Sequence, residues 1–194
     1  MSKSDPNSAK RHRNKVVRWV IVIFFTTILI SGTISLISDE IMENSGIVVA
    51  FVILMVIILI GIIFDIIGMA VATADEKPFH SMAARKVPGA QEAIALLRNA
   101  ERVSSICNDV VGDICGVVAG SASATVAVQV LQRFSCSWPD MVSLVLSALV
   151  AGLTVGGKAI GKTVAINSCT GIVHTVGKVI YGFRRIPRMF SKKK

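Results

Sequence analysis

The stretch I-V-V-A-F-V-I-L-M-V-I-I-L-I-G-I-I-F, residues 47–64, carries neither a charge nor a strongly polar side chain. Apolar residues continue around it from residue 46 to residue 72, with Asp65 as the one charged position. A helix needs about 20 such residues to cross the roughly 30 Å hydrocarbon core of a bilayer. This stretch therefore predicts a transmembrane helix, and its surroundings decide the rest of the fold.

Three further apolar stretches surround this one, at residues 19–38, 104–132 and 141–157. The first also fits a cleaved signal peptide, because basic residues precede it. Its length, and the lack of an A-x-A site after it, favour a helix that is retained in the protein. We therefore predict an all-α, polytopic membrane protein with about four transmembrane helices.

The composition agrees with a chain that lies mostly in lipid. Hydrophobic residues make up 53% and charged residues 17% of the sequence, whereas soluble domains carry roughly 25% charged residues. The four cysteines lack metal-ligand spacing, so we expect them to be small packing residues. P-loop, H-E-x-x-H and G-x-S-x-G motifs are absent, and we expect no enzymatic activity.

The distribution of basic residues predicts the orientation. Residues 39–45 hold three acids and no Lys or Arg, whereas residues 73–103 hold five Lys or Arg, and both chain ends are strongly basic. By the positive-inside rule, both termini and residues 73–103 are cytoplasmic in a multi-pass protein of the cell membrane. Because the basic N-terminus, 1–18, and the interfacial C-terminal segment, 167–194, flank apolar spans, we expect them to contact lipid headgroups and not nucleic acid. The arginines expected at this surface are Arg11, Arg13, Arg18, Arg184, Arg185 and Arg188.

Residues 73–103 are expected to form a helical hairpin on the cytoplasmic membrane surface. Pro78 is placed to open a short helix at 79–85, and Pro88-Gly89 is a turn signal. Residues 90–103 then follow a helical apolar period. With this hairpin included, residues 46–166 form a three-helix transmembrane domain, and residues 19–38 add a further helix.

Three acids, Asp65, Asp109 and Asp113, fall inside predicted spans, and an ionisable residue there is a functional hypothesis by default. At about 1.5 Å per residue, Asp65 and Asp113 lie roughly 15 Å inside the nearest charges on the cytoplasmic side. Each shares a helix face with small residues, which predicts that the acids face a helix–helix contact and not lipid. The glycines expected to pack helices together are Gly61, Gly68, Gly112, Gly116, Gly120, Gly152 and Gly156.

Carboxylates gathered in a medium of low dielectric constant repel one another, and we expect no Lys or Arg at their level to neutralise them. Mg²⁺ is satisfied by one or two carboxylates with waters and neutral oxygens, so Asp65, Asn108, Asp109 and Asp113 are the candidate ligands. Two other interpretations remain open: protonated Asp side chains that hydrogen-bond between helices, and proton transfer.

Three segments resemble the transmembrane domain of the cyclin-M / CorB-CorC family of magnesium and cobalt transport proteins. They are F-D-I-I-G-M-A-V-A-T-A-D at 64–75, A-L-L-R-N-A-E-R with I-C-N-D-V-V-G-D-I between 95 and 114, and G-K-A-I-G-K-T-V-A at 157–165. The sequence departs from the family where Asp65, Ile67 and Gly68 stand in place of Ser, Ser and Glu, and no CBS domain follows in it.

The resemblance implies three transmembrane helices with a cytoplasmic hairpin belt, assembled as a dimer that binds Mg²⁺ near the middle of the membrane. It places Asn108 on a motif asparagine and Asp65 as an oxygen ligand. Two functions are therefore expected as alternatives. One is binding or transport of divalent cations. The other is a non-transporting scaffold or regulatory subunit that forms homodimers through small-residue helix faces.

Overall fold

The computed structural model describes residues 6–134 and 138–191, and within these ranges every regular element is a helix. The predicted all-α class is confirmed for this part of the chain. In chain order, the elements are α1 (Pro6–Glu43), α2 (Ile47–Thr73), α3 (Lys77–Ala84), α4 (Ala90–Leu97), α5 (Ala100–Ser105), the π-helix η1 (Ile106–Gly112), α6 (Asp113–Phe134), α7 (Pro139–Asn167) and α8 (Cys169–Ser191).

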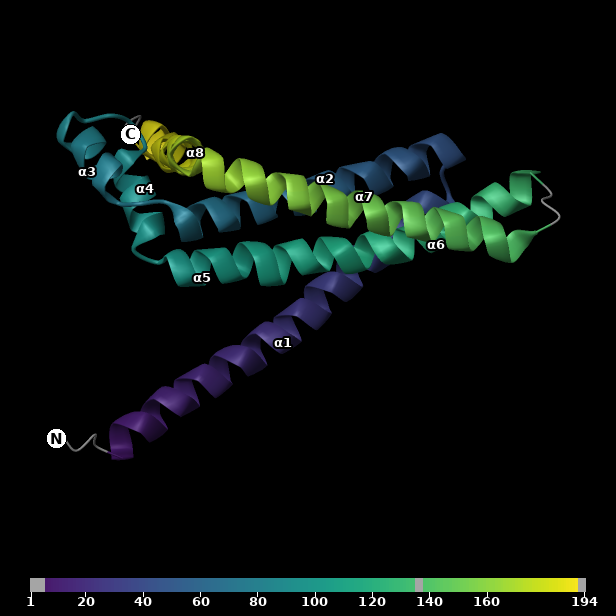
Figure 1. Ribbon diagram of the computed structural model, residues 1–194, viewed down its shortest axis with the longest axis horizontal. Coiled ribbons are helices and arrows are strands. Elements are labelled where there is room, and N and C mark those ends of the chain that lie inside the picture. The colour runs from purple at the N-terminus through teal and green to yellow at the C-terminus, as the bar shows by residue number, and fades with distance from the viewer. Residues whose placement is uncertain (1–5, 135–137, 192–194) are drawn as a thin grey trace.

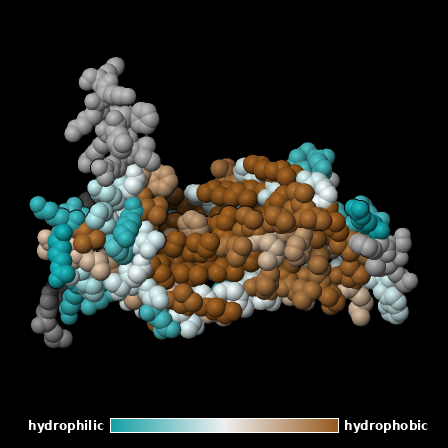
Figure 2. Space-filling model, turned by 90° about the horizontal axis from the view of Figure 1, so that it is seen from above, coloured by the Kyte–Doolittle hydropathy of each residue, from teal (hydrophilic) through white to brown (hydrophobic). Residues whose placement is uncertain are grey.

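Four stretches of the described residues are long and apolar enough to cross a membrane, as expected. They are Val17–Met42, Ile47–Thr73, Ala100–Arg133 and Asp140–Asn167. Figure 2 shows a broad hydrophobic belt between two hydrophilic ends, which is the surface that a membrane-spanning bundle presents to lipid. The last stretch is predicted to end near Gly157, whereas the helix α7 continues to Asn167.

Helices α2, α6 and α7 lie side by side along the length of the molecule, and α5 and η1 continue the line of α6 (Figure 1). Helix α1 diverges from them toward its N-terminal end and packs against the bundle near its C-terminal end (Figure 1). There Thr125 Oγ1 of α6 donates to Asp39 Oδ1 at 3.3 Å, and Gln129 Nε2 donates to the Met42 carbonyl.

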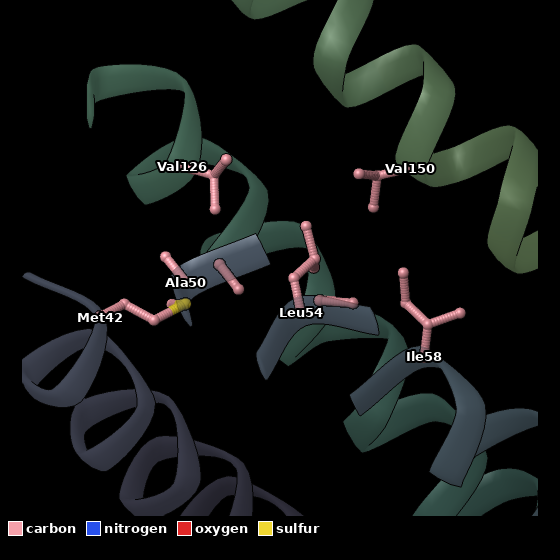
Figure 3. Packing of buried hydrophobic residues seen from close by; sticks show 8 residues of the cluster. Met42, Ala50, Leu54, Ile58, Val126 and Val150 are labelled. Atoms are coloured by element: carbon pink, nitrogen blue, oxygen red, sulfur yellow. The ribbon is translucent and has the colours of Figure 1, made fainter. Parts of the chain in front are cut away.

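One end of the bundle, near the α1–α2 turn, is filled mainly by apolar side chains; we call it the apolar half. Leu54 and Ile58 of α2 point toward Val150 of α7, while Val126 of α6 lies beside Ala50 (Figure 3). In lipid, close packing of this kind holds helices together by dispersion, because burial from water adds little. The buried members of the cluster are Met42, Ala50, Leu54, Ile58, Ala119, Ala122, Val126 and Val150.

At the opposite end, α3, α4 and α8 cover the ends of the spans. Phe79 of α3, Ala93 of α4 and Val173 of α8 are fully buried in a second apolar cluster, which also contains Ala70 of α2. Gly89, with φ of 85°, adopts a left-handed conformation between α3 and α4, at the predicted turn. The single helix expected over 90–103 is wrong, because the chain breaks at Arg98–Asn99 between α4 and α5.

Candidate intramembrane site

A cavity of about 250 Å³ lies between α2, α7 and the junction of η1 with α6. It occupies the half of the bundle nearer to α3 and α4, which we call the polar half. All four candidate ligands predicted from the sequence line this one cavity. The lining residues are Asp65, Met69, Asn108, Asp109, Asp113, Lys158 and Lys162.

Lys158 lies at the centre of the polar contacts. Its Nζ is 2.9 Å from Asp65 Oδ2 and 3.9 Å from Asp113 Oδ1, and it donates to the Gly112 carbonyl oxygen at 3.3 Å. The Asp65 side chain is 18% exposed and that of Lys158 is 30% exposed. The expectation that no Lys or Arg lies at the level of the acids is therefore wrong.

Two glycines of α7 explain why a lysine reaches this level. A Cβ at Gly157 would approach Ile62 Cγ1 to 3.3 Å, and one at Gly161 would approach Ile66 Cγ1 to 2.8 Å. Without those atoms α7 packs closely on α2, and the stem of Lys158 reaches Asp65. The spacing of Gly157 and Gly161 is a small-residue pattern of the kind that marks helix contacts. Reading it as part of a span would have placed Lys158 inside the bundle.

The π-helix η1 alters which residues share a face. Its wider i→i+5 turn offsets residues before it from residues after it, and such turns occur frequently at functional sites. A regular helical period predicts one face made of Asp109, Gly112, Asp113, Gly116, Gly120 and Ala124. In the structure Gly112 is buried and Asp109 and Asp113 are exposed, with 71% of the Asp113 side chain accessible. The expectation that all three acids face a helix contact is confirmed only for Asp65.

The remaining predicted ligands, in η1, have hydrogen-bond partners one turn earlier in α5. Ser105 Oγ donates to Asp109 Oδ2 at 2.6 Å, and Asn108 Nδ2 donates to Ser104 Oγ at 3.2 Å. The other amide atom, Asn108 Oδ1, is buried without a hydrogen-bond partner among the described residues. It packs against Gly68, where a Cβ would come within 2.8 Å of Asn108 Cγ.

The chemistry of the site is that of a mixed ion cluster. Among the described residues, no group of three or more His, Cys, Asp or Glu side chains is arranged to hold a metal ion. Asp65 and Asp113 come from different helices, and an ammonium group lies between them. The cavity is therefore lined by three carboxylates and two amines, and the positive charge that Asp65 and Asp113 contact is the Lys158 ammonium.

The predicted packing glycines divide into two groups. Gly61, Gly68 and Gly112 pack within the chain: a Cβ at Gly61 would come within 2.9 Å of Cys115 Cβ, and one at Gly112 would overlap Asp65 Oδ1. The other four have open space where a Cβ would lie. They are Gly116, Gly120, Gly152 and Gly156.

The basic residues predicted for the membrane surface are only partly described. Arg18 of α1 and Arg184 of α8 are exposed. The side chains of Arg11, Arg13, Arg185 and Arg188 lie outside the described residues, although their backbones belong to α1 and α8.

Comparisons with known proteins found no matching family, no significantly similar curated protein and no significantly similar solved structure. The resemblance to the CorB-CorC transmembrane domain therefore stays a prediction from the residues themselves.

Proposed function

We propose that this chain is an integral membrane protein that binds a cation from the cytoplasmic side, in a cavity where the Lys158 ammonium acts as a tethered competitor. The observation that carries the proposal is the environment of Lys158 Nζ, which contacts oxygens of Asp65, Gly112 and Asp113. Oxygen atoms from two helices surround a positive charge at this point, and a free cation would require the same surroundings.

The charge pattern supports access from one side. The acidic segment 39–45 lies at the apolar half, and the basic segment 73–103 lies at the polar half, so the cavity belongs to the cytoplasmic side by the positive-inside rule. The apolar half contains the buried cluster around Leu54 and Val126, which leaves little room for water. An ion that enters the cavity would meet this cluster at the far end.

Exchange between lysine and a cation follows from charge balance. Asp65, Asp109 and Asp113 contribute three negative charges against the positive charges of Lys158 and Lys162, so the lining carries a net charge of −1. When the flexible stem of Lys158 withdraws, the negative charges of Asp65 and Asp113 lose their positive partner. A divalent cation can neutralise both charges. Mg²⁺ is the preferred cargo, because it needs only one or two carboxylates and keeps several of its waters.

The test removes the competitor. In Lys158→Met the tethered charge is lost, and we expect millimolar Mg²⁺ to raise the melting temperature of the purified protein. The wild-type protein should respond less, because its own ammonium competes for the same oxygens. Lys162→Met is the matched control: it removes a lysine at the same cavity that has no ion pair with Asp65.

Two outcomes would contradict the proposal. One is a Lys158→Met protein that is folded but melts at the same temperature with and without Mg²⁺. The other is a Mg²⁺ response that survives in Lys158→Met/Asp65→Asn, because the nearest carboxylate would then have no part in binding. Sodium chloride at equal ionic strength separates specific binding from screening.

A second candidate function is a non-transporting scaffold that forms homodimers. It is favoured by Gly116 and Gly120, which leave open space on α6 beside the exposed Asp113. An exposed carboxylate within a membrane span is costly, and close approach of a second copy along the glycines would shield it. Gly116→Leu should then convert a dimer to a monomer in mild detergent, whereas Gly32→Leu, also in open space, should have no effect. A wild-type monomer would exclude this candidate.

A further inference from the structure

Helix α8 takes a different direction from the spans. It starts directly after α7, from which it is separated by Ser168. In Figure 1 the spans run across the view, whereas α8 is seen nearly along its own axis. If α7 crosses a bilayer, α8 therefore runs roughly along the membrane surface. It lies beside α4, which belongs to the same end of the molecule.

One side of α8 is committed to packing within the chain. Val173 is fully buried, and Gly177 is so close to α4 that a Cβ there would come within 3.2 Å of Ala93 Cβ. Gly177 also contacts the Gly89 carbonyl oxygen. This side fixes the rotation of α8 about its axis, and so decides what its other two sides present.

The two remaining sides differ in character. Val179 and Phe183 are four residues apart and share one edge, where they are 53% and 70% exposed. The edge opposite Val173 carries small or polar residues, all exposed: Gly171, Thr175, Lys178 and Gly182. A helix with an apolar edge beside a polar edge that includes a lysine is typical of one that lies in the interface between lipid and water.

The charge of this segment indicates which lipid. Residues 178–194 contain seven Lys or Arg and no acid. We propose that α8 is an interfacial helix whose Val179–Phe183 edge inserts among acyl chains and whose basic residues, Lys178 and Arg184 among them, bind the headgroups of anionic phospholipids. Basic segments next to a membrane span are attracted to anionic lipids in this way.

The first experiment measures the depth of each edge. Spin labels are placed on Phe183→Cys and Thr175→Cys, in a background whose native cysteines are replaced by alanine, in liposomes of phosphatidylcholine with phosphatidylglycerol. We expect the label at 183 to collide mainly with dissolved oxygen, which partitions into acyl chains. The label at 175 should collide mainly with a water-soluble nickel complex. Equal exposure of both labels to the nickel complex would overturn the insertion.

The second experiment keeps the native cysteines. The melting temperature of the wild-type protein should be higher in nanodiscs containing phosphatidylglycerol than in phosphatidylcholine alone. Lys178→Gln/Arg184→Gln should lose at least half of this shift. Arg133→Gln, at the other end of the bundle, should keep it. An equal shift in the double variant and the wild type, or no shift in the wild type, would overturn the lipid proposal. If the lipid shift is absent and the label at 183 is also accessible to the nickel complex, the basic residues of α8 would instead bind an acidic protein partner.

Discussion

The apolar half and the polar half of the bundle are built from the same three helices but are held together differently. In the apolar half, Leu54, Ala122 and Val126 are buried among other apolar side chains. In the polar half, Asp65 and Lys158 form an ion pair beside a cavity. Many small dispersion contacts hold the apolar half together, whereas the polar half depends on a few charged interactions. Single substitutions should therefore act very unequally along one helix.

The largest effect is expected in the polar half. Asp65→Ala removes the nearest carboxylate from Lys158 and should lower the free energy of unfolding by about 3 kcal/mol, the low end for a buried ion pair because this pair is partly exposed. Adding Lys158→Met should restore most of the loss, since no unpaired charge then remains. Reversible unfolding in mixed micelles measures both. If the double variant is as unstable as Asp65→Ala, the ion pair is not the reason for the loss.

An intermediate effect is expected in the apolar half. Leu54→Ala leaves a void among Ile58, Val126 and Val150 and should cost about 2 kcal/mol, near the low end for such changes because burial from water adds little in lipid. Leu59→Ala, at an exposed position of the same helix, is the control and should be nearly silent. The Mg²⁺ response of Lys158→Met should persist in combination with Leu54→Ala. Loss of that response would show that the two halves are coupled.

The smallest effect is expected where α1 joins the bundle. Asp39→Ala removes one hydrogen bond from Thr125 and should cost about 0.5–1 kcal/mol. Thr125→Val should cost a similar amount, and the two changes together no more than either alone. A cost of several kcal/mol would mean that α1 is a main support of the apolar half and not an addition to it. The same unfolding measurement distinguishes these results.

Much of the apolar half could be predicted from sequence. A continuous apolar run such as residues 47–64 favours a helix in lipid, because a helix satisfies its own backbone hydrogen bonds. The polar half was harder. Counting helical rise puts Asp65 and Asp113 at one level, and in the structure both line one cavity together with Asn108 and Asp109. The exposure of Asp109 and Asp113 was not predicted. A regular helical period assumes an α-helix throughout and does not reveal the π-helix η1, which changes the direction of these side chains.

The length of α7 differs from the prediction for another reason. The sequence predicts that the last span ends at Gly157, just before Lys158, since charges usually mark the membrane surface. A lysine inside a bundle is possible when a carboxylate and close helix packing compensate it, and those partners come from α2, far away in sequence. A single charged residue therefore does not define the end of a span until it is known whether a neighbouring helix supplies a partner for the charge.

The contact of Gly89 with Gly177 brings the backbone of the α3–α4 turn directly against that of α8. Backbone atoms of the two segments touch there with no side chain between them. Ser168, the residue at which α7 ends, joins α8 to the helix that carries Lys158. Val173 of α8 also packs in one cluster with Ala165 of α7 and Ala70 of α2, so a displaced α8 would disturb two of the helices that line the cavity. A larger residue at Gly177 would force α8 away from the α3–α4 turn.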